Sequence, residues 1–159
     1  MTISIEPVLQ FGDFTSPLRN IRARLDEYSL VLDLVPSRTL PDSVKVDPGL
    51  SDALKLIIGG GHEIVEADSF LRLEFEQIWG WMTHEELSEN VAIPLPVEEW
   101  PQLPNRRGAF PFVKVIGSPW LAQVPDHQSE NMFHFRIWSM TTYMDIISGD
   151  PEGRWLPNT

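Results

Sequence analysis

The chain has 159 residues, and its content of 42% hydrophobic and 22% charged residues is typical of a globular protein rather than a disordered one. Its 23 acidic and 12 basic residues give a formal charge of −11, which disfavours binding to the phosphate backbone of a nucleic acid. The chain has no cysteine, which excludes disulfides, thiolate metal ligands and a thiol nucleophile. No apolar run approaches the roughly 20 residues of a membrane span.

These totals predict a single domain over residues 1–159. Residues 1–6 lack the basic and apolar regions of a signal peptide, so we expect a cytoplasmic protein without a membrane segment. An acidic field of this size accelerates encounter with a basic partner. We therefore expect a protein partner with a basic surface, and neither a nucleic acid nor a membrane.

Alternating apolar and polar residues predict strands in the first part of the chain. Five segments before residue 70 show strand character: residues 2–7, 21–25, 28–35, 54–58 and 63–67. The second and third are separated by Asp26-Glu27, which predicts a hairpin. We expect Pro36 and Pro41 to end this hairpin, because proline has no N–H to donate to a strand ladder.

Residues 70–81 predict the central strand of the fold. Its apolar and charged residues fall on opposite faces, Leu71, Leu73 and Phe75 on one and Arg72, Glu74 and Glu76 on the other. Gly80, between two tryptophans, predicts a bulge near the end of this strand. Gln77 breaks the alternation, which indicates either a shift of register at a bulge or a hydrogen bond in the core. Residues 83–89 then predict a single helical turn with Thr83 as its cap.

The second half of the chain is rich in proline, with seven of the 14 prolines between residues 94 and 125. There we expect a strand at residues 112–116, a packed loop at 119–128 and a strand at 132–139. Residues 140–148 fit a helical face as well as a strand, and their β-branched side chains favour a strand in a hairpin. These elements predict a mainly β fold, an antiparallel β-sandwich or flattened barrel with at most one or two short helices.

Outward-facing aromatic and charged side chains are the candidate binding residues. In the strand at residues 132–139, alternation places His134, Arg136 and Trp138 outward. Six tryptophans are several-fold more than average usage for this length, and tryptophan is common in binding hot spots. The predicted binding residues are Trp138, His134, Arg136, Glu74, Glu76 and Trp81. In this hypothesis the carboxylates meet a basic surface and the tryptophans fill pockets of the partner.

No motif in the chain predicts catalysis, a metal site or a cofactor. The four histidines lack the spacing of zinc ligands, such as HExxH, and no G-x-S-x-G accompanies Gly59-Gly60-Gly61. We therefore predict a protein that binds another protein and is not an enzyme. Two other functions fit the sequence: a β-sandwich module that binds carbohydrate through its tryptophans, and a hydrolase with Glu74 and Glu76 as a carboxylate pair.

Two parts of the chain together resemble a group of known proteins. The first is the predicted strand from Leu71 to Trp81 with the acidic turn Glu85-Glu86 after it. The second is His134-Phe135-Arg136-Ile137, followed by Asp-Ile-Ile at residues 145–147. This combination resembles small all-β bacterial proteins of unknown function, including predicted immunity proteins of polymorphic toxin systems. The resemblance implies a compact, acidic, cytoplasmic protein that occludes the active site of a toxin, and it implies no catalytic residues.

Overall fold

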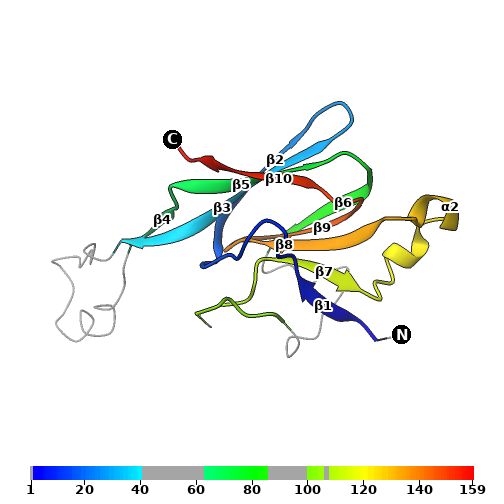
Figure 1. Ribbon diagram of the computed structural model, residues 1–159, viewed down its shortest axis with the longest axis horizontal. Helices are drawn as coiled ribbons and strands as arrows, with labels where there is room; N and C mark the ends of the chain where they lie inside the picture. The colour runs from blue at the N-terminus through cyan, green and yellow to red at the C-terminus, as the bar shows by residue number, and fades with distance from the viewer. Residues whose placement is uncertain (1, 41–62, 86–99, 106–107) are drawn as a thin grey trace.

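Two antiparallel sheets make up the fold in the computed structural model, which describes residues 2–40, 63–85, 100–105 and 108–159 (Figure 1). The strands are β1 (Ser4–Pro7), β2 (Leu18–Leu25), β3 (Leu30–Leu40), β4 (Glu63–Glu66), β5 (Ser69–Phe75), β6 (Ile78–Glu85), β7 (Phe112–Ile116), β8 (Phe133–Trp138), β9 (Thr142–Ser148) and β10 (Glu152–Pro157). Sheet A has the order β1-β7-β8-β9-β6, and sheet B has the order β10-β5-β3-β2 with β4 paired to β3. This arrangement confirms the predicted antiparallel β-sandwich.

One apolar core joins the inner faces of the two sheets. Its central side chains are Leu30, Leu32 and Leu34 from β3, Leu71, Leu73 and Phe75 from β5, Phe135 and Ile137 from β8, and Met144 and Ile146 from β9. The rings of Phe75 and Phe135 meet between the sheets at a centroid distance of 5.7 Å. Because these residues alternate along each strand, the opposite faces of the sheets carry the polar and charged side chains.

The predicted hairpin in the first part of the chain is confirmed by β2 and β3. The prediction that Pro36 ends it is wrong, because β3 continues through Pro36 to Leu40. On one side, β3 pairs with β5 up to Leu34 and with β4 from Ser37 onward. Pro36 lies in the gap between these two pairings, so its missing N–H falls where the strand changes partner. The predicted strand at residues 54–58, the turn at 59–61 and Pro41 lie outside the described residues.

The prediction of one long central strand at residues 70–81 is also wrong. The stretch forms β5 in sheet B and β6 in sheet A, joined by the turn at Glu76 and Gln77. The misfit at Gln77 marks this change of sheet, where its carbonyl accepts the N–H of Gly149 at 3.0 Å. The predicted bulge near Gly80 is confirmed by a shift of register between Ile78 and Gly80.

The second half of the chain follows the predicted pattern with three additional elements. The strands at residues 112–116 and 132–139 are confirmed as β7 and β8, and residues 142–148 form β9, as the hairpin prediction required. The loop after β7 contains a 3₁₀ turn, η2 (Leu121–Gln123), and a one-turn helix, α2 (Asp126–Ser129). Strand β10 was not predicted, since its alternation is weak around Gly153.

Helices play a minor part in the ranges that the structure describes. The helical turn predicted at residues 83–89 is wrong for Thr83 to Glu85, which continue β6, and its remaining residues lie outside the described ranges. Within the described ranges, no helix has the length and apolar character needed to cross a bilayer.

Candidate functional site

The outer face of sheet A is covered, which changes the environment of three predicted binding residues. His134, Arg136 and Trp138 share one face of β8 as predicted, but only 1%, 1% and 8% of their surfaces are exposed. The prediction that they are exposed is therefore wrong. The ring of Trp120, from the loop after β7, lies 5.5 Å from the His134 ring, and Trp100 lies 4.5 Å from Trp138. Alternation predicts on which face of the sheet a side chain lies, but it does not predict whether a loop covers that face.

A buried carboxylate, that of Asp145 on β9, is the centre of this covered layer. Arg136 lies opposite it on β8 and donates two hydrogen bonds, from Nε to Oδ1 at 2.8 Å and from Nη2 to Oδ2 at 2.9 Å. His134 Nε2 lies 2.7 Å from Oδ1, and His84 Nε2 from β6 lies 3.5 Å from Oδ2. Two strands of sheet A, β8 and β6, therefore direct basic side chains at one carboxylate on β9. We call Ser118, His134, Arg136 and Asp145 the buried polar network.

Ser118 extends this network to the loop after β7. An ionised carboxylate only accepts hydrogen bonds, so the His134 nitrogen that faces Asp145 carries the proton. In neutral His134 the other nitrogen, Nδ1, is then an acceptor, and Ser118 Oγ lies 2.7 Å from it. The Ser118 hydroxyl donates to His134 while its oxygen accepts the backbone N–H of Leu121 at 3.1 Å. The result is a continuous chain of hydrogen bonds from Leu121 through Ser118 and His134 to Asp145.

The pKa of Asp145 lies below its ordinary value despite the burial of this group. Burial alone would raise the pKa, but the hydrogen bonds from His134 and Arg136 and the positive charge of Arg136 outweigh it. The carboxylate of Asp145 is therefore ionised in the folded protein, as its two hydrogen bonds from Arg136 require.

We expect acid to weaken folding through Asp145. Above the pKa of an unfolded aspartate, about 3.9, the Asp145 carboxyl is ionised in both the folded and the unfolded protein, and its stabilising effect is fully present. Below that pH the carboxyl of the unfolded protein binds a proton before that of the folded protein does. The free energy of unfolding should therefore fall as the pH drops through the lowered pKa. Denaturant unfolding of wild type and Asp145→Asn between pH 5 and about pH 2.5 measures this contribution as a difference in slope. Equal slopes in the two proteins would contradict the prediction.

A groove lies beside Ser118 and has a volume of about 610 Å³. Its apolar wall includes Ile3, Leu121 and Val124, and Ser129 lines it as well. Ser118 follows Gly117, whose φ of 71° turns the chain sharply out of β7. Ser118 is 4% exposed, and it lines this groove.

Two exposed tryptophans mark the outer strand of sheet A. Trp81 and Trp79 on β6 are 40% and 38% exposed. Trp81 lies opposite Ile146 and so shares the face of β9 that points to the core, whereas Trp79 contacts Trp120 on the outer face at 6.4 Å. Trp81 was among the predicted binding residues and Trp79 was not. The signal for Trp79 was present in the sequence, as a second tryptophan on the other side of Gly80.

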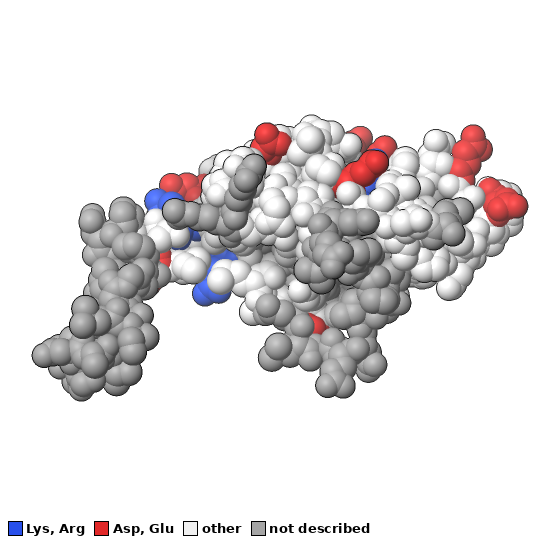
Figure 2. Space-filling model, turned by 90° about the horizontal axis from the view of Figure 1, so that it is seen from below, with Lys and Arg blue, Asp and Glu red and all other residues white. Residues whose placement is uncertain are grey.

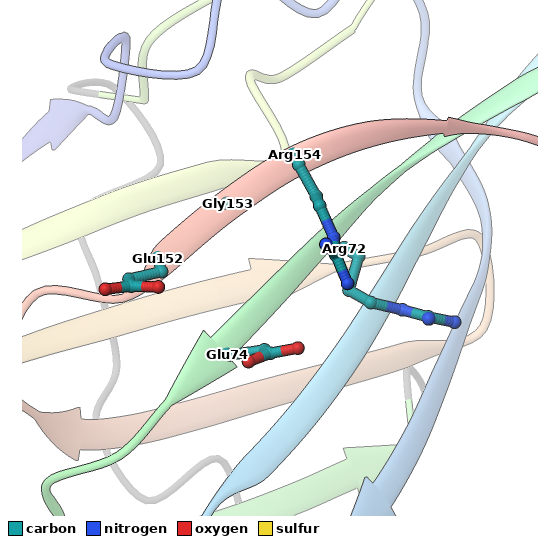
Figure 3. Close-up of a pocket in the computed structure, with 5 residues that line it drawn as sticks. All are labelled: Arg72, Glu74, Glu152, Gly153 and Arg154. Atoms are coloured by element: carbon teal, nitrogen blue, oxygen red, sulfur yellow. The ribbon is translucent and has the colours of Figure 1, made fainter.

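Glu74 and Glu76 do not form the predicted pair on one strand. Glu74 is half-buried on the outer face of β5, but Glu76 is exposed in the turn after that strand. Glu74 instead lines a pocket of about 130 Å³ with Glu152, Arg72 and Arg154, and Figure 3 shows the glutamates on one side and the arginines on the other.

The arginines of this pocket belong to a mixed-charge outer face of sheet B. Arg72 donates to Asp33 from Nε at 2.7 Å and from Nη2 at 2.9 Å, and these hydrogen bonds raise the pKa of Arg72. Arg22 and Arg72 both lie over the ring of Phe70, at 5.8 and 5.5 Å. Arg72, which lines the pocket, is therefore held in place by Asp33.

Comparison of the chain with models of protein families, with curated proteins and with solved structures finds no match.

Proposed function

We propose that this protein binds another protein through the β6 surface, which we define as Trp79 and Trp81 with the strand between them. The observation that carries the proposal is the exposure of two neighbouring indoles, at 38% and 40%. Exposed apolar groups of this size are common in interaction sites, and tryptophan is enriched among residues that dominate binding energy.

The two indoles lie on opposite faces of β6. This strand is at the edge of sheet A, and among the described strands it pairs only with β9. At this edge, Trp81 lies on the face of β6 that points to the core, and Trp79 lies on the opposite face, against Trp120. A partner segment that lies along this edge would contact both rings.

The charge of the chain favours a basic partner. Figure 2 shows acidic groups along one rim of the molecule and at the right-hand end, where Figure 1 places α2, with most basic groups toward the opposite end. Glu76 is exposed in the turn that leads into β6, so it adds an acidic side chain at the start of the strand that carries both indoles. Acidic side chains around an interface mainly raise the rate of encounter with a basic protein.

The sharpest form of the proposal is an immunity-type protein in the cytoplasm that occludes a basic toxin. It is supported by the acidic charge, the exposed indoles and the resemblance of the sequence to predicted immunity proteins. Its mechanism is steric, because the bound protein covers the functional surface of its partner.

Trp81→Ala is expected to weaken partner binding by more than ~2 kcal/mol, since a hot-spot indole contributes at least that much. The partner is first captured from a lysate of the source cell at low and moderate salt and identified by mass spectrometry. Isothermal titration with the purified partner then gives the affinities of wild type and variant. Trp155→Ala is the matched control, because Trp155 is equally exposed, at 39%, but lies on β10 of sheet B. Unchanged affinity of Trp81→Ala with unchanged melting would reject the proposal.

The exposed indoles favour carbohydrate as a second candidate ligand, because indole rings stack on sugars. Titration with a panel of sugars, followed by tryptophan fluorescence, tests this candidate. A flat response across the panel would remove it, and a response lost in Trp81→Ala but kept in Trp155→Ala would support it.

A further inference from the structure

The buried polar network and the groove meet at one residue, Ser118. The network holds Ser118 Oγ 2.7 Å from His134 Nδ1, and His134 Nε2 lies 2.7 Å from Asp145 Oδ1. The same serine lines the groove of about 610 Å³. A serine, a base and an orienting carboxylate in hydrogen-bond contact, next to an open groove, are the parts of a nucleophilic site.

We propose that Ser118 is a nucleophile activated by His134, and that the groove accepts the acyl group of a small ester. This inference goes beyond protein binding and does not depend on it. It also departs from the prediction that the chain has no catalytic residue.

The direction of the hydrogen bonds supports the assignment. Asp145 accepts from His134 Nε2, so Nδ1 holds the lone pair that faces the Ser118 hydroxyl. The imidazole is turned relative to the usual serine-hydrolase arrangement, and Nδ1 takes the role of base that Nε2 has there. Arg136, with two hydrogen bonds to Asp145, keeps the carboxylate in place and thereby fixes the orientation of His134.

The surroundings of the serine define the substrate class. Ile3, Leu121 and Val124 give the groove an apolar wall that suits a short acyl chain. The backbone N–H of Leu121 donates to Ser118 Oγ at 3.1 Å, which stabilises negative charge on this oxygen. The low exposure of Ser118, 4%, restricts access to small, unbranched esters.

The reaction is an acyl transfer followed by hydrolysis. Ser118 Oγ attacks the ester carbonyl carbon while its proton passes to His134 Nδ1. When the carbon–oxygen bond to the alcohol breaks, the leaving oxygen takes that proton and the alcohol departs. Water then attacks the acylated serine, with His134 accepting and returning its proton, so that one ester and one water yield one acid and one alcohol.

Covalent labelling with an alkyl fluorophosphonate tests the proposal on the wild-type full-length protein. The probe forms a phosphonyl–serine bond with release of fluoride. We expect one adduct by intact mass, located on Ser118 by peptide mass spectrometry, and no adduct on protein unfolded in urea. Ser118→Ala should abolish labelling, whereas Ser69→Ala, which alters an exposed serine on β5 of sheet B, should leave it unchanged. His134→Gln should slow labelling by about 100-fold or more, because the general base is lost.

Two results would overturn the proposal. One is wild-type protein that stays unlabelled at Ser118 at saturating probe. The other is a label that persists equally in the unfolded protein, which would show that the folded geometry does not activate the serine. Hydrolysis of p-nitrophenyl butyrate by wild type and by Ser69→Ala, but not by Ser118→Ala, would support the complete reaction.

Discussion

Replacing Arg136 with methionine is expected to lower the free energy of unfolding by about 3–5 kcal/mol. The Asp145 side chain has no exposed surface, and Arg136 supplies two of its hydrogen bonds. Methionine fills similar space but leaves the carboxylate buried without its main counter-charge. Denaturant unfolding followed by circular dichroism near neutral pH measures the loss.

Sheet B offers a matched control for this experiment. Arg72 and Asp33 make the same two-pronged contact at 2.7 and 2.9 Å, but their side chains keep 21% and 10% exposure. Arg72→Met is therefore expected to cost less than Arg136→Met, since the carboxylate of Asp33 keeps some contact with water and that of Asp145 keeps none. Equal losses in the two variants would show that burial does not set the importance of the Arg136–Asp145 pair.

Phe135→Ala is expected to lower the free energy of unfolding by about 3–5 kcal/mol. The ring is fully buried and bridges the sheets, with Phe75 and Phe112 each at a centroid distance of 5.7 Å. Its removal leaves a cavity in the centre of the core, and the rigid strands around it close that cavity only in part. Thermal and denaturant unfolding give the measurement.

Phe133→Ala is the control for Phe135→Ala, because Phe133 lies on the same strand and face but is only half-buried beneath Lys114. A clearly smaller loss is expected there, since less apolar surface returns to water. A loss as large as that of Phe135→Ala would mean that the core is not centred between β5 and β8.

Much of the fold could be predicted because apolar and polar residues alternate along most of the strands. The leucines of β3 and the Leu71–Phe75 face of β5 point to the core as their spacing indicates. The same spacing could not show that the chain leaves sheet B after Phe75 and enters sheet A at Ile78. A strand that ends and a strand that continues have the same alternation, and only a few residues such as Gln77 mark the difference.

Part of the buried polar network could be predicted from the sequence. A hairpin with its turn between Met140 and Thr141 pairs Arg136 with Asp145, and the structure has this register. The contribution of Ser118 could not be predicted, because it depends on how the loop after β7 folds back over the sheet. The same loop places Trp120 against His134 on the outer face of β8, and Trp100, from the segment before β7, covers Trp138 on that face.

The pairing of the outer strands has a consequence for the speed of folding. In sheet A, Ser4 of β1 pairs with Ile116 of β7, and in sheet B, Leu71 of β5 pairs with Trp155 of β10. Hairpins such as β8–β9 close within a few residues, but these two pairings require loops of many tens of residues to close first. Chains dominated by such distant pairings fold in milliseconds to seconds rather than microseconds. We therefore expect these distant pairings, rather than the hairpins, to limit the rate at which the native sandwich is completed.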